Sequence, residues 1–318
     1  MARVCVFAPA PIVTVTIESG TARRSAPPGH ERPGDDIHLH VGGQGVWVGR
    51  MLAELGADVV VCASFGGETG QVARALLAEM GLGLAAVSVE AWNGAYVHDR
   101  RDGERHEVAS MLDGVLTRHD VDDLYGRTLG EALASDALVM TGPQTDDTIP
   151  ADVYRRLAHD VRANGGWVIA DLSGERLDAA VAGGVDLLKV SHEELERDGR
   201  LRPGGSLADA AEQLRREGAG DVVITLGAEG AHALLGSKHH TVLPPTVEVH
   251  DPRGAGDSVT AALTVGVLSG LEVLDALKLA VAAGAVNVTR RGLGTGSRAE
   301  IDALTEHVEV TVLGHSAS

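Results

Sequence analysis

His250-Asp-Pro-Arg-Gly-Ala-Gly-Asp-Ser258 is the most informative stretch of this sequence, and the apolar run Val259–Leu268 follows it directly. A Gly-Ala-Gly turn that leads into a helix leaves several backbone N–H groups without partners, so Gly254, Ala255 and Gly256 are predicted to form an anion hole at the positive end of the helix dipole. Asp257 would lie beside the bound anion and accept a proton from an attacking hydroxyl. The alternative is that Asp257 only caps the helix and the glycines only form a tight turn.

Working outward from this stretch, short apolar runs alternate with helical patterns along most of the chain. The predicted strands are Val4–Ala8, Val59–Ala63, Ala137–Thr141, Trp167–Asp171, Leu187–Val190 and Val222–Leu226. The predicted helices include Val46–Leu55, Gln71–Met80, Ala151–Asn164, Leu207–Glu217 and Ser258–Ser269. Repeated βα units predict an α/β fold with three layers, in which a mostly parallel central sheet is covered by helices on both faces.

Two polar segments interrupt this alternation. The residues from Ile12 to Leu39 combine β-branched side chains with a Pro/Gly/Arg-rich loop, and Tyr96–Val108 has the pattern of a hairpin turning at Asp102-Gly103. We expect these insertions, at about 12–39 and 92–110, to form a small β-sheet lid over an active site. The alternative is that they only decorate the surface.

Composition excludes several classes of function. The chain has 318 residues, of which 44% are hydrophobic and only 3% aromatic, so its core must be built from small and branched aliphatic side chains. A formal net charge of -18 argues against nucleic acid and against anionic membranes as partners. The two cysteines, Cys5 and Cys62, are expected to be reduced and buried, and without a long apolar run or signal peptide the expected location is the cytoplasm.

Other motifs give no support to competing enzyme classes. The sequence has no P-loop, no HExxH, no CxxC and no GxSxG pattern. Gly292–Gly296 resembles part of a dinucleotide fingerprint, but it follows a predicted helix where the fingerprint requires a strand. His239-His240 is interpreted as a surface turn and not as a metal site.

Several segments resemble one known family along nearly the whole chain. Gly254–Asp257 resembles the GAGD signature of PfkB carbohydrate kinases, and Gly42–Gly56 resembles their N-terminal glycine signature. Related segments follow in the family's order, namely Phe65–Gly70, Ala170–Gly174, Lys189–Leu195 and Thr225–Gly230. The resemblance implies one ribokinase-like domain over residues 1–318 and is strongest for the 1-phosphofructokinase and tagatose-6-phosphate kinase branch.

The resemblance also implies the roles of particular residues. Asp257 would be the catalytic base, and Glu194 would influence a Mg²⁺ ion through water. An alternative leaves Glu193 and Glu194 in the solvated first turn of a helix. The implied ATP-binding residues are Thr225, Gly227, Gly230 and Gly254–Gly256, with Gly284 and Asn287 near the adenine, and the implied substrate-binding residues are Gly42, Gly43, Gln44 and Trp47.

The sequence departs from the family pattern where the sugar is usually held. Ile12 stands at the position of an Asp that binds sugar hydroxyls, Gln44 at that of a Lys that reaches a substrate phosphate, and Trp47 at that of an Asn. Ser191 replaces the Asn of the family's NxxE motif, and an Arg of the second lid strand corresponds loosely to Asn93. We therefore expect the acceptor to be bound in a non-standard way, with Trp47 either an apolar platform for a ring or a core residue.

The function predicted from these residues is ATP-dependent phosphorylation of a hydroxyl of a sugar or sugar phosphate. The changed pocket leaves two alternatives, a kinase-derived nucleotide- or ligand-binding protein and a nucleoside kinase on which Trp47 stacks the base. Related kinases also pair through their lids, so a homodimer is a further expectation.

Overall fold

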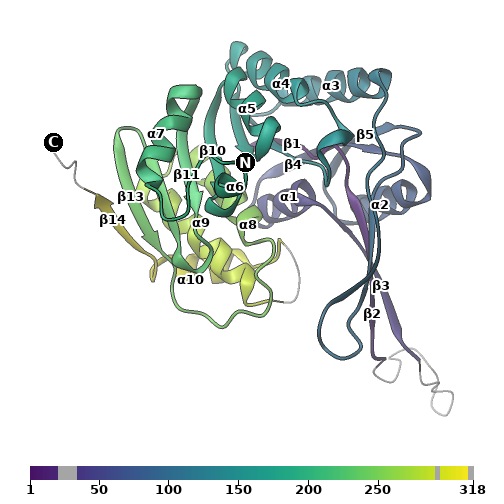
Figure 1. Cartoon of the computed structure of the whole chain (residues 1–318). Coiled ribbons are helices and arrows are strands. Elements are labelled where there is room, and N and C mark those ends of the chain that lie inside the picture. The colour runs from purple at the N-terminus through teal and green to yellow at the C-terminus, as the bar shows by residue number, and fades with distance from the viewer. Residues whose placement is uncertain (21–33, 291–293, 314–318) are drawn as a thin grey trace.

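A ten-stranded sheet forms the centre of the molecule (Figure 1). The structure is a computed structural model and describes residues 1–20, 34–290 and 294–313. The strand order is β14-β13-β12-β11-β10-β9-β8-β1-β4-β5. Strands β5, β4, β1, β8, β9, β10 and β11 are parallel, and β12, β13 and β14 extend the sheet in antiparallel fashion. Their bounds are β1 Arg3–Phe7, β4 Asp58–Phe65, β5 Gly83–Ser88, β8 Ala137–Thr141, β9 Trp167–Asp171, β10 Val185–Ser191, β11 Ala219–Thr225, β12 Ala231–Leu235, β13 Lys238–Leu243 and β14 Glu309–Leu313.

Helices cover both faces of this sheet, as the alternation of β1 shows. Val4 and Val6 pack into one apolar cluster, while Cys5 and Phe7 pack into the other on the opposite face. The first cluster includes α1 Gln44–Glu54, α2 Gly67–Glu79, α8 Ala255–Leu268, α9 Val273–Val288 and α10 Arg298–Thr305. The second includes α3 Arg118–Leu133, α4 Asp152–Ala163, α5 Gly174–Gly183, α6 His192–Arg197 and α7 Leu207–Glu217. This arrangement confirms the predicted three layers.

Small side chains let the two central apolar helices, α8 and α9, approach each other closely. A Cβ added to Gly266 would lie 2.8 Å from the Cβ of Ala276, and one added to Gly284 would lie 3.1 Å from a methyl group of Val259. The scarcity of aromatic residues is therefore compensated by close packing of Ala, Gly and Val.

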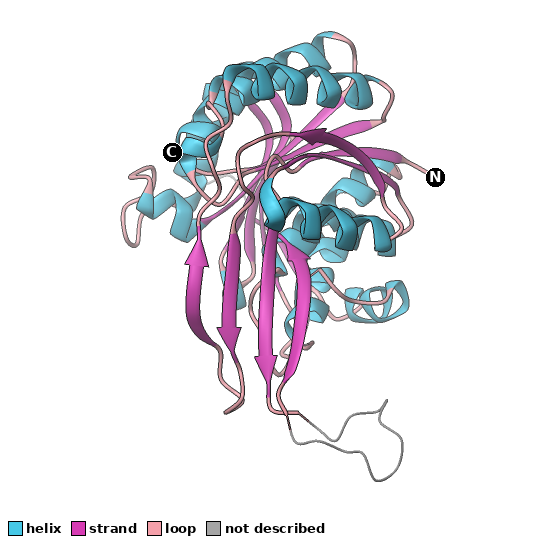
Figure 2. Cartoon of the chain, turned by 90° about the vertical axis from the view of Figure 1, so that its right-hand side faces the viewer, coloured by secondary structure: helices cyan, strands magenta, loops and turns pink. Residues whose placement is uncertain are grey.

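A separate four-stranded sheet projects from this body (Figure 2), in the order β3-β2-β6-β7. Its strands are β2 Ile12–Glu18, β3 Asp36–Gly42, β6 Ala95–Asp99 and β7 His106–Met111, and we call it the small sheet. The register places Thr14 opposite both His40 and Tyr96, and Thr16 opposite both His38 and His98. Because side chains alternate along a strand, these six polar residues share one face of the small sheet.

The structure confirms every strand and helix predicted from the sequence, including the hairpin between β6 and β7, and it adds elements that were not predicted. The antiparallel strands β12–β14 and the edge strand β5 were missed. The interpretation of His239-His240 as a surface turn is wrong, because both residues lie within β13 and His240 is buried. Among the described residues no cluster of three or more His, Cys, Asp or Glu side chains is arranged to hold a metal ion directly.

Two further expectations concern the thiols and the membrane. Cys5 and Cys62 are buried free thiols on neighbouring strands, with their sulfur atoms 3.5 Å apart. Over residues 1–20, 34–290 and 294–313, none of the helices combines the length and apolar character needed to cross a membrane.

Candidate active site

The carboxyl ends of the parallel strands and the start of α8 meet at one edge of the central sheet. Asp171 ends β9, and Lys189 lies opposite it near the end of β10. The hydroxyl of Thr260 on α8 donates a 2.6 Å hydrogen bond to Asp171, which fixes the helix against these strand ends. Ligands of open α/β sheets bind at such an edge.

The turn before α8 has the geometry of an anion-binding loop. Gly254 is the N-cap residue and adopts a left-handed conformation (φ 74°, ψ 0°) that a side chain would disfavour. Ser258 donates the first backbone hydrogen bond to the carbonyl of Gly254, at 3.0 Å, so the amides of residues 255–257 have no partner within the helix. No side-chain hydrogen bond caps this helix, so Asp257, its third residue, is not the capping residue of the simpler alternative.

A buried ion pair lies directly beneath this turn. Lys189 Nζ is 3.1 Å from both carboxylate oxygens of Asp171, and both side chains are at most 6% exposed. The ammonium group is also close to the turn, since a Cβ added to Gly256 would lie 2.6 Å from Nζ. Burial alone would lower the pKa of Lys189, but the charges of Asp171, Glu194 and Asp257 raise it, so the ammonium stays charged.

Asp257 has a strongly raised pKa. Burial raises the pKa of this carboxyl to about 8, with a further contribution from Asp171, while Lys189 acts in the opposite direction. A basic carboxylate next to unpaired amides is suited to take a proton from a hydroxyl.

Glu194 lies in the first turn of α6, as the simpler alternative expects, and its charge also reaches the site. Its Oε2 accepts hydrogen bonds from the amide and the hydroxyl of Ser191, each at 2.8 Å, in a capping box at the start of α6. Since both bonds go to Oε2, Oε1 keeps its capacity to accept another ligand. The charge of Glu194 also reaches the site, where it raises the pKa values of Asp257 and Lys189.

The loop after β11 carries three of the expected nucleotide-binding residues. Thr225 ends the strand, Gly227 begins a short 3-10 helix, and Gly230 closes it with a hydrogen bond to the carbonyl of Gly227 (3.1 Å). Gly230 has a φ of 91°, and a Cβ added there would lie 1.9 Å from the carbonyl oxygen of Val242. Only glycine fits this position, which lies at the same edge of the sheet as Asp171.

Asn287 and Gly284, expected near the adenine, contribute to the framework of the site. The buried Asn287 side chain donates to the carbonyl of Arg253 (2.7 Å) and accepts from the amides of Gly294 and Thr295 (2.9 and 3.3 Å). Its amide therefore links the loop before Gly254 to the chain beyond α9. Gly284 faces the first turn of α8, where a Cβ would lie 3.4 Å from the carbonyl of Ala255.

A large cavity of about 1170 Å³ lies between the small sheet, α1 and the loop that precedes Gly254. Trp47 is half-buried and lines this cavity together with Ile12 and Gly42, so its ring is a wall of the cavity and not a core residue. Gln44 is not among the residues that line the cavity. Its Oε1 accepts a hydrogen bond from the amide of Gly142 at 3.1 Å. Gly43 is the N-cap of α1, with a φ of 108°.

Sequence reasoning missed Asp171 and Lys189 as site residues. A charged residue within an otherwise apolar strand was the available signal, since such a residue is buried only when it is paired. Asn93, loosely matched to an Arg, is 2% exposed, and its side chain bonds to backbone groups of Pro11, Ser64 and Gly66.

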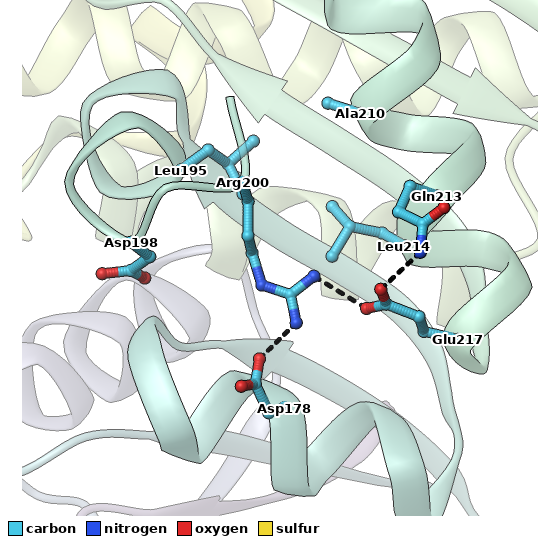
Figure 3. A pocket seen from close by; sticks show the side chains of 8 residues that line it. All are labelled: Asp178, Leu195, Asp198, Arg200, Ala210, Gln213, Leu214 and Glu217. Atoms are coloured by element: carbon cyan, nitrogen blue, oxygen red, sulfur yellow. Dashed lines mark hydrogen bonds and ion pairs between the residues drawn. The ribbon is translucent and has the colours of Figure 1, made fainter. Parts of the chain in front are cut away.

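A smaller cavity, of about 400 Å³, lies outside this site between α5, α6 and α7 (Figure 3). Arg200 reaches into it and forms ion pairs with Asp178 and with Glu217. Arg200 is therefore paired within the cavity, which Asp198 also lines.

Comparison with known proteins then decides the family. The model of the pfkB family carbohydrate kinases matches residues 4–300. The chain belongs to the PfkB family of carbohydrate kinases. This membership confirms the predicted family, and with it the enzyme class, kinases that transfer a phosphoryl group to an alcohol.

Relatives of this kinase share its length as well as its sequence. The chain is 30% identical over 275 residues to the ATP-dependent 6-phosphofructokinase isozyme 2 of Mycobacterium tuberculosis, covering 83% of this chain and 79% of that protein. It is 28% identical over 275 residues to the 1-phosphofructokinase of Escherichia coli, covering 86% and 88%. The crystal structure of Escherichia coli phosphofructokinase-2 with potassium superposes with a TM-score of 0.81 at 24% identity, over 96% of this chain and 99% of that one, which confirms the ribokinase-like fold.

Proposed function

We propose that this kinase transfers the γ-phosphoryl group of ATP to a hydroxyl of a sugar or sugar phosphate. The observation that carries the proposal is the start of α8, where Asp257, with a pKa of about 8, adjoins the unpaired amides of residues 255–257. The relatives named as phosphofructokinases support a phosphorylated sugar as the acceptor.

The amides beyond Gly254 would stabilise the charge on the transferring phosphoryl group, with Gly254, Ala255 and Gly256 forming the anion hole. Asp257 would take the proton of the attacking hydroxyl. The loop of Thr225, Gly227 and Gly230 would hold the nucleotide at the neighbouring strand end, and Asn287 would position the anion hole through the carbonyl of Arg253.

Mg²⁺ would enter with the nucleotide. The charges of Asp171, Glu194 and Asp257 act on a single ammonium group, that of Lys189, so the site has excess negative charge that suits a hydrated Mg²⁺ bound through water. When bound, the ion would neutralise phosphate charge and lower the pKa of Asp257, which restores the basic form at neutral pH. Glu194 is the residue proposed to influence it, through Oε1.

The acceptor would occupy the large cavity, which Gly42 and Trp47 line, and Gly43 and Gln44 at the start of α1 are the neighbouring residues proposed to bind it. Ile12 offers no hydrogen-bond acceptor, but Thr14 lines the same cavity from the same strand and supplies a hydroxyl. Because the ring of Trp47 lines the cavity, a nucleoside acceptor stacked on the indole is the second candidate function.

The proposal extends to assembly and location. Ile37, Leu39 and Val108 leave apolar side chains exposed on the small sheet (62%, 45% and 62%), and a second copy would cover them in a homodimer formed through the lid. Replacing Ile37 by Lys should then yield monomers in light scattering, and unchanged dimers would exclude this interface. The buried free thiols and the use of ATP support a cytoplasmic location.

The deciding experiment is a phosphoryl-transfer screen with ATP and Mg²⁺ across sugars, sugar phosphates and nucleosides. We expect turnover of at least one acceptor and a loss of several orders of magnitude in kcat in Asp257→Asn, with ATP binding retained. Asp275→Asn, an exposed residue in the first turn of the next helix, is the matched control. ATP binding without transfer to any acceptor would favour a binding protein, and preference for nucleosides would favour the second candidate.

A further inference from the structure

Two arginines of the small sheet border the large cavity without a partner of opposite charge. Arg100 and Arg105 flank the turn between β6 and β7, and both line the cavity. Within the described part of the chain, neither side chain forms an ion pair with a carboxylate.

Neighbouring arginines behave differently. Arg101, between these two in the same turn, forms ion pairs with Asp99 (2.6 Å) and Asp35 (3.1 Å). Arg200 is likewise neutralised in the smaller cavity (Figure 3). Arg100 and Arg105 face the large cavity without a carboxylate partner, which indicates that a ligand supplies the negative charge.

Arg105 is nevertheless held in place by an uncharged partner. Its Nη2 donates to Nε2 of His98 at 2.7 Å, and an arginine can only donate, so His98 must accept with a neutral ring. Burial, together with the charge of Arg105, lowers the pKa of this histidine, which keeps it neutral. The guanidinium is therefore oriented without being neutralised.

Both arginines lie across the cavity from the loop that leads into the anion hole. Their charges act on Asp251, where they lower a pKa that burial raises. Thr16 and His38, on the same face of the small sheet and in the same cross-strand row as His98, line the cavity beside them. Guanidinium, hydroxyl and imidazole groups together offer more donors than the two oxygens of a carboxylate can use, which favours a phosphate.

We infer that Arg100 and Arg105 form the subsite for a phosphate monoester on the acceptor, so that the kinase selects phosphorylated sugars over neutral ones. The inference rests on the proposed function for the identity of the acceptor. The inference places the phosphate that the acceptor already carries on the small sheet. It lies away from Gln44, whose Oε1 is bonded to the amide of Gly142. The same charges would also attract the phosphates of ATP or inorganic phosphate, and the test separates these sources.

The test measures binding by calorimetry without turnover. Fructose 6-phosphate, fructose 1-phosphate, fructose, inorganic phosphate and ATP are titrated into wild type, Arg100→Gln, Arg105→Gln and the control Arg101→Gln. We expect the Kd of a sugar phosphate to rise about 10- to 100-fold in the first two variants and to stay within about twofold in Arg101→Gln. Fructose and ATP should bind equally to all four proteins, and Arg105→Lys should recover part of the loss.

Several results would overturn the inference. These are failure of the wild-type protein to bind either sugar phosphate, an equal loss for fructose or for Arg101→Gln, and a loss confined to ATP or to inorganic phosphate. The outcome is distinguishable from that of the proposed function. Arginine-dependent binding without phosphoryl transfer would refute the transfer reaction alone, whereas turnover of sugar phosphates with unchanged KM in Arg105→Gln would refute the subsite alone.

Discussion

Replacing Asp171 by Asn should move the pH dependence of the reaction toward acid. In the wild type the charge of Asp171 raises the pKa of Asp257, whereas the charge of Lys189 lowers it. Asp171 also forms an ion pair with Lys189. Asn removes the negative charge and frees the ammonium group from its partner, so both effects lower the pKa of Asp257. The amide oxygen can still accept the hydrogen bond of Thr260, which preserves the attachment of α8.

The magnitude follows from the position of these charges. A charge within a few ångströms changes a pKa by about one to three. At pH 6, a carboxyl with a pKa of about 8 is ionised in about 1% of molecules, and one whose pKa is lower by two in about half. The basic form of Asp257 should therefore be up to about fiftyfold more abundant in the variant at pH 6.

The assay is the pH profile of kcat/KM from pH 5 to 9, which reports ionisations of the free enzyme. We expect the acidic limb to shift downward by at least one pH unit, even if the maximal rate falls because a buried charge has lost its partner. Asp275→Asn is the control for a carboxylate far from the site, and a melting curve checks that each variant is folded. An acidic limb that stays in place, or moves toward alkali, would refute the electrostatic account.

Three further predictions concern the same framework. Asp257→Asn should stabilise the protein by several kcal/mol at pH 8 but hardly at pH 4. The Asp257 carboxyl has a pKa of about 8 in the folded protein and near 3.8 in the unfolded chain, so the folded wild type loses stability as the pH rises between these values. Melting curves of both proteins at pH 4 and pH 8 test this. Gly230→Ala should raise the KM for ATP and destabilise the fold more than Gly227→Ala, since both have positive φ but only Gly230 meets a carbonyl oxygen; equal effects would contradict the packing argument. Asn287→Ala should lower the free energy of unfolding by about 2 to 4 kcal/mol, because three backbone groups lose their partner, and denaturant titration measures it.

The sequence was sufficient for the fold wherever strands were apolar and helices periodic. Trp167–Asp171 and Leu207–Glu217 were predicted to the residue, because buried parallel strands and amphipathic helices have distinctive patterns. Strands β12 and β13 were missed because their mixed sequences, such as Lys238–Leu243 with its two histidines, lack a clear alternation. Their pairing depends on contacts with β11 that no local pattern shows.

The candidate site was predictable only where a motif is local. The turn of Gly254–Gly256 and the position of Asp257 followed from one short stretch. Asp171 and Lys189 meet only because β9 and β10 are neighbours in register, and their effect on Asp257 depends on burial. Charged pairs between neighbouring strands can be predicted only when the order and register of the strands are known.

The departures at Gln44 and Trp47 acquire a physical reason once the cavity is considered as a whole. The usual cation of the glycine signature is absent, and the side-chain oxygen of Gln44 is occupied by a backbone amide, so position 44 contributes no positive charge. Positive charge is supplied instead by Arg100 and Arg105, on an element that would approach an acceptor from the opposite side. With its positive charge on the small sheet, the site should distinguish acceptors through Arg100 and Arg105. Replacing these arginines should therefore change the preference among acceptors, whereas changes around Asp257 should alter the rate for every acceptor alike.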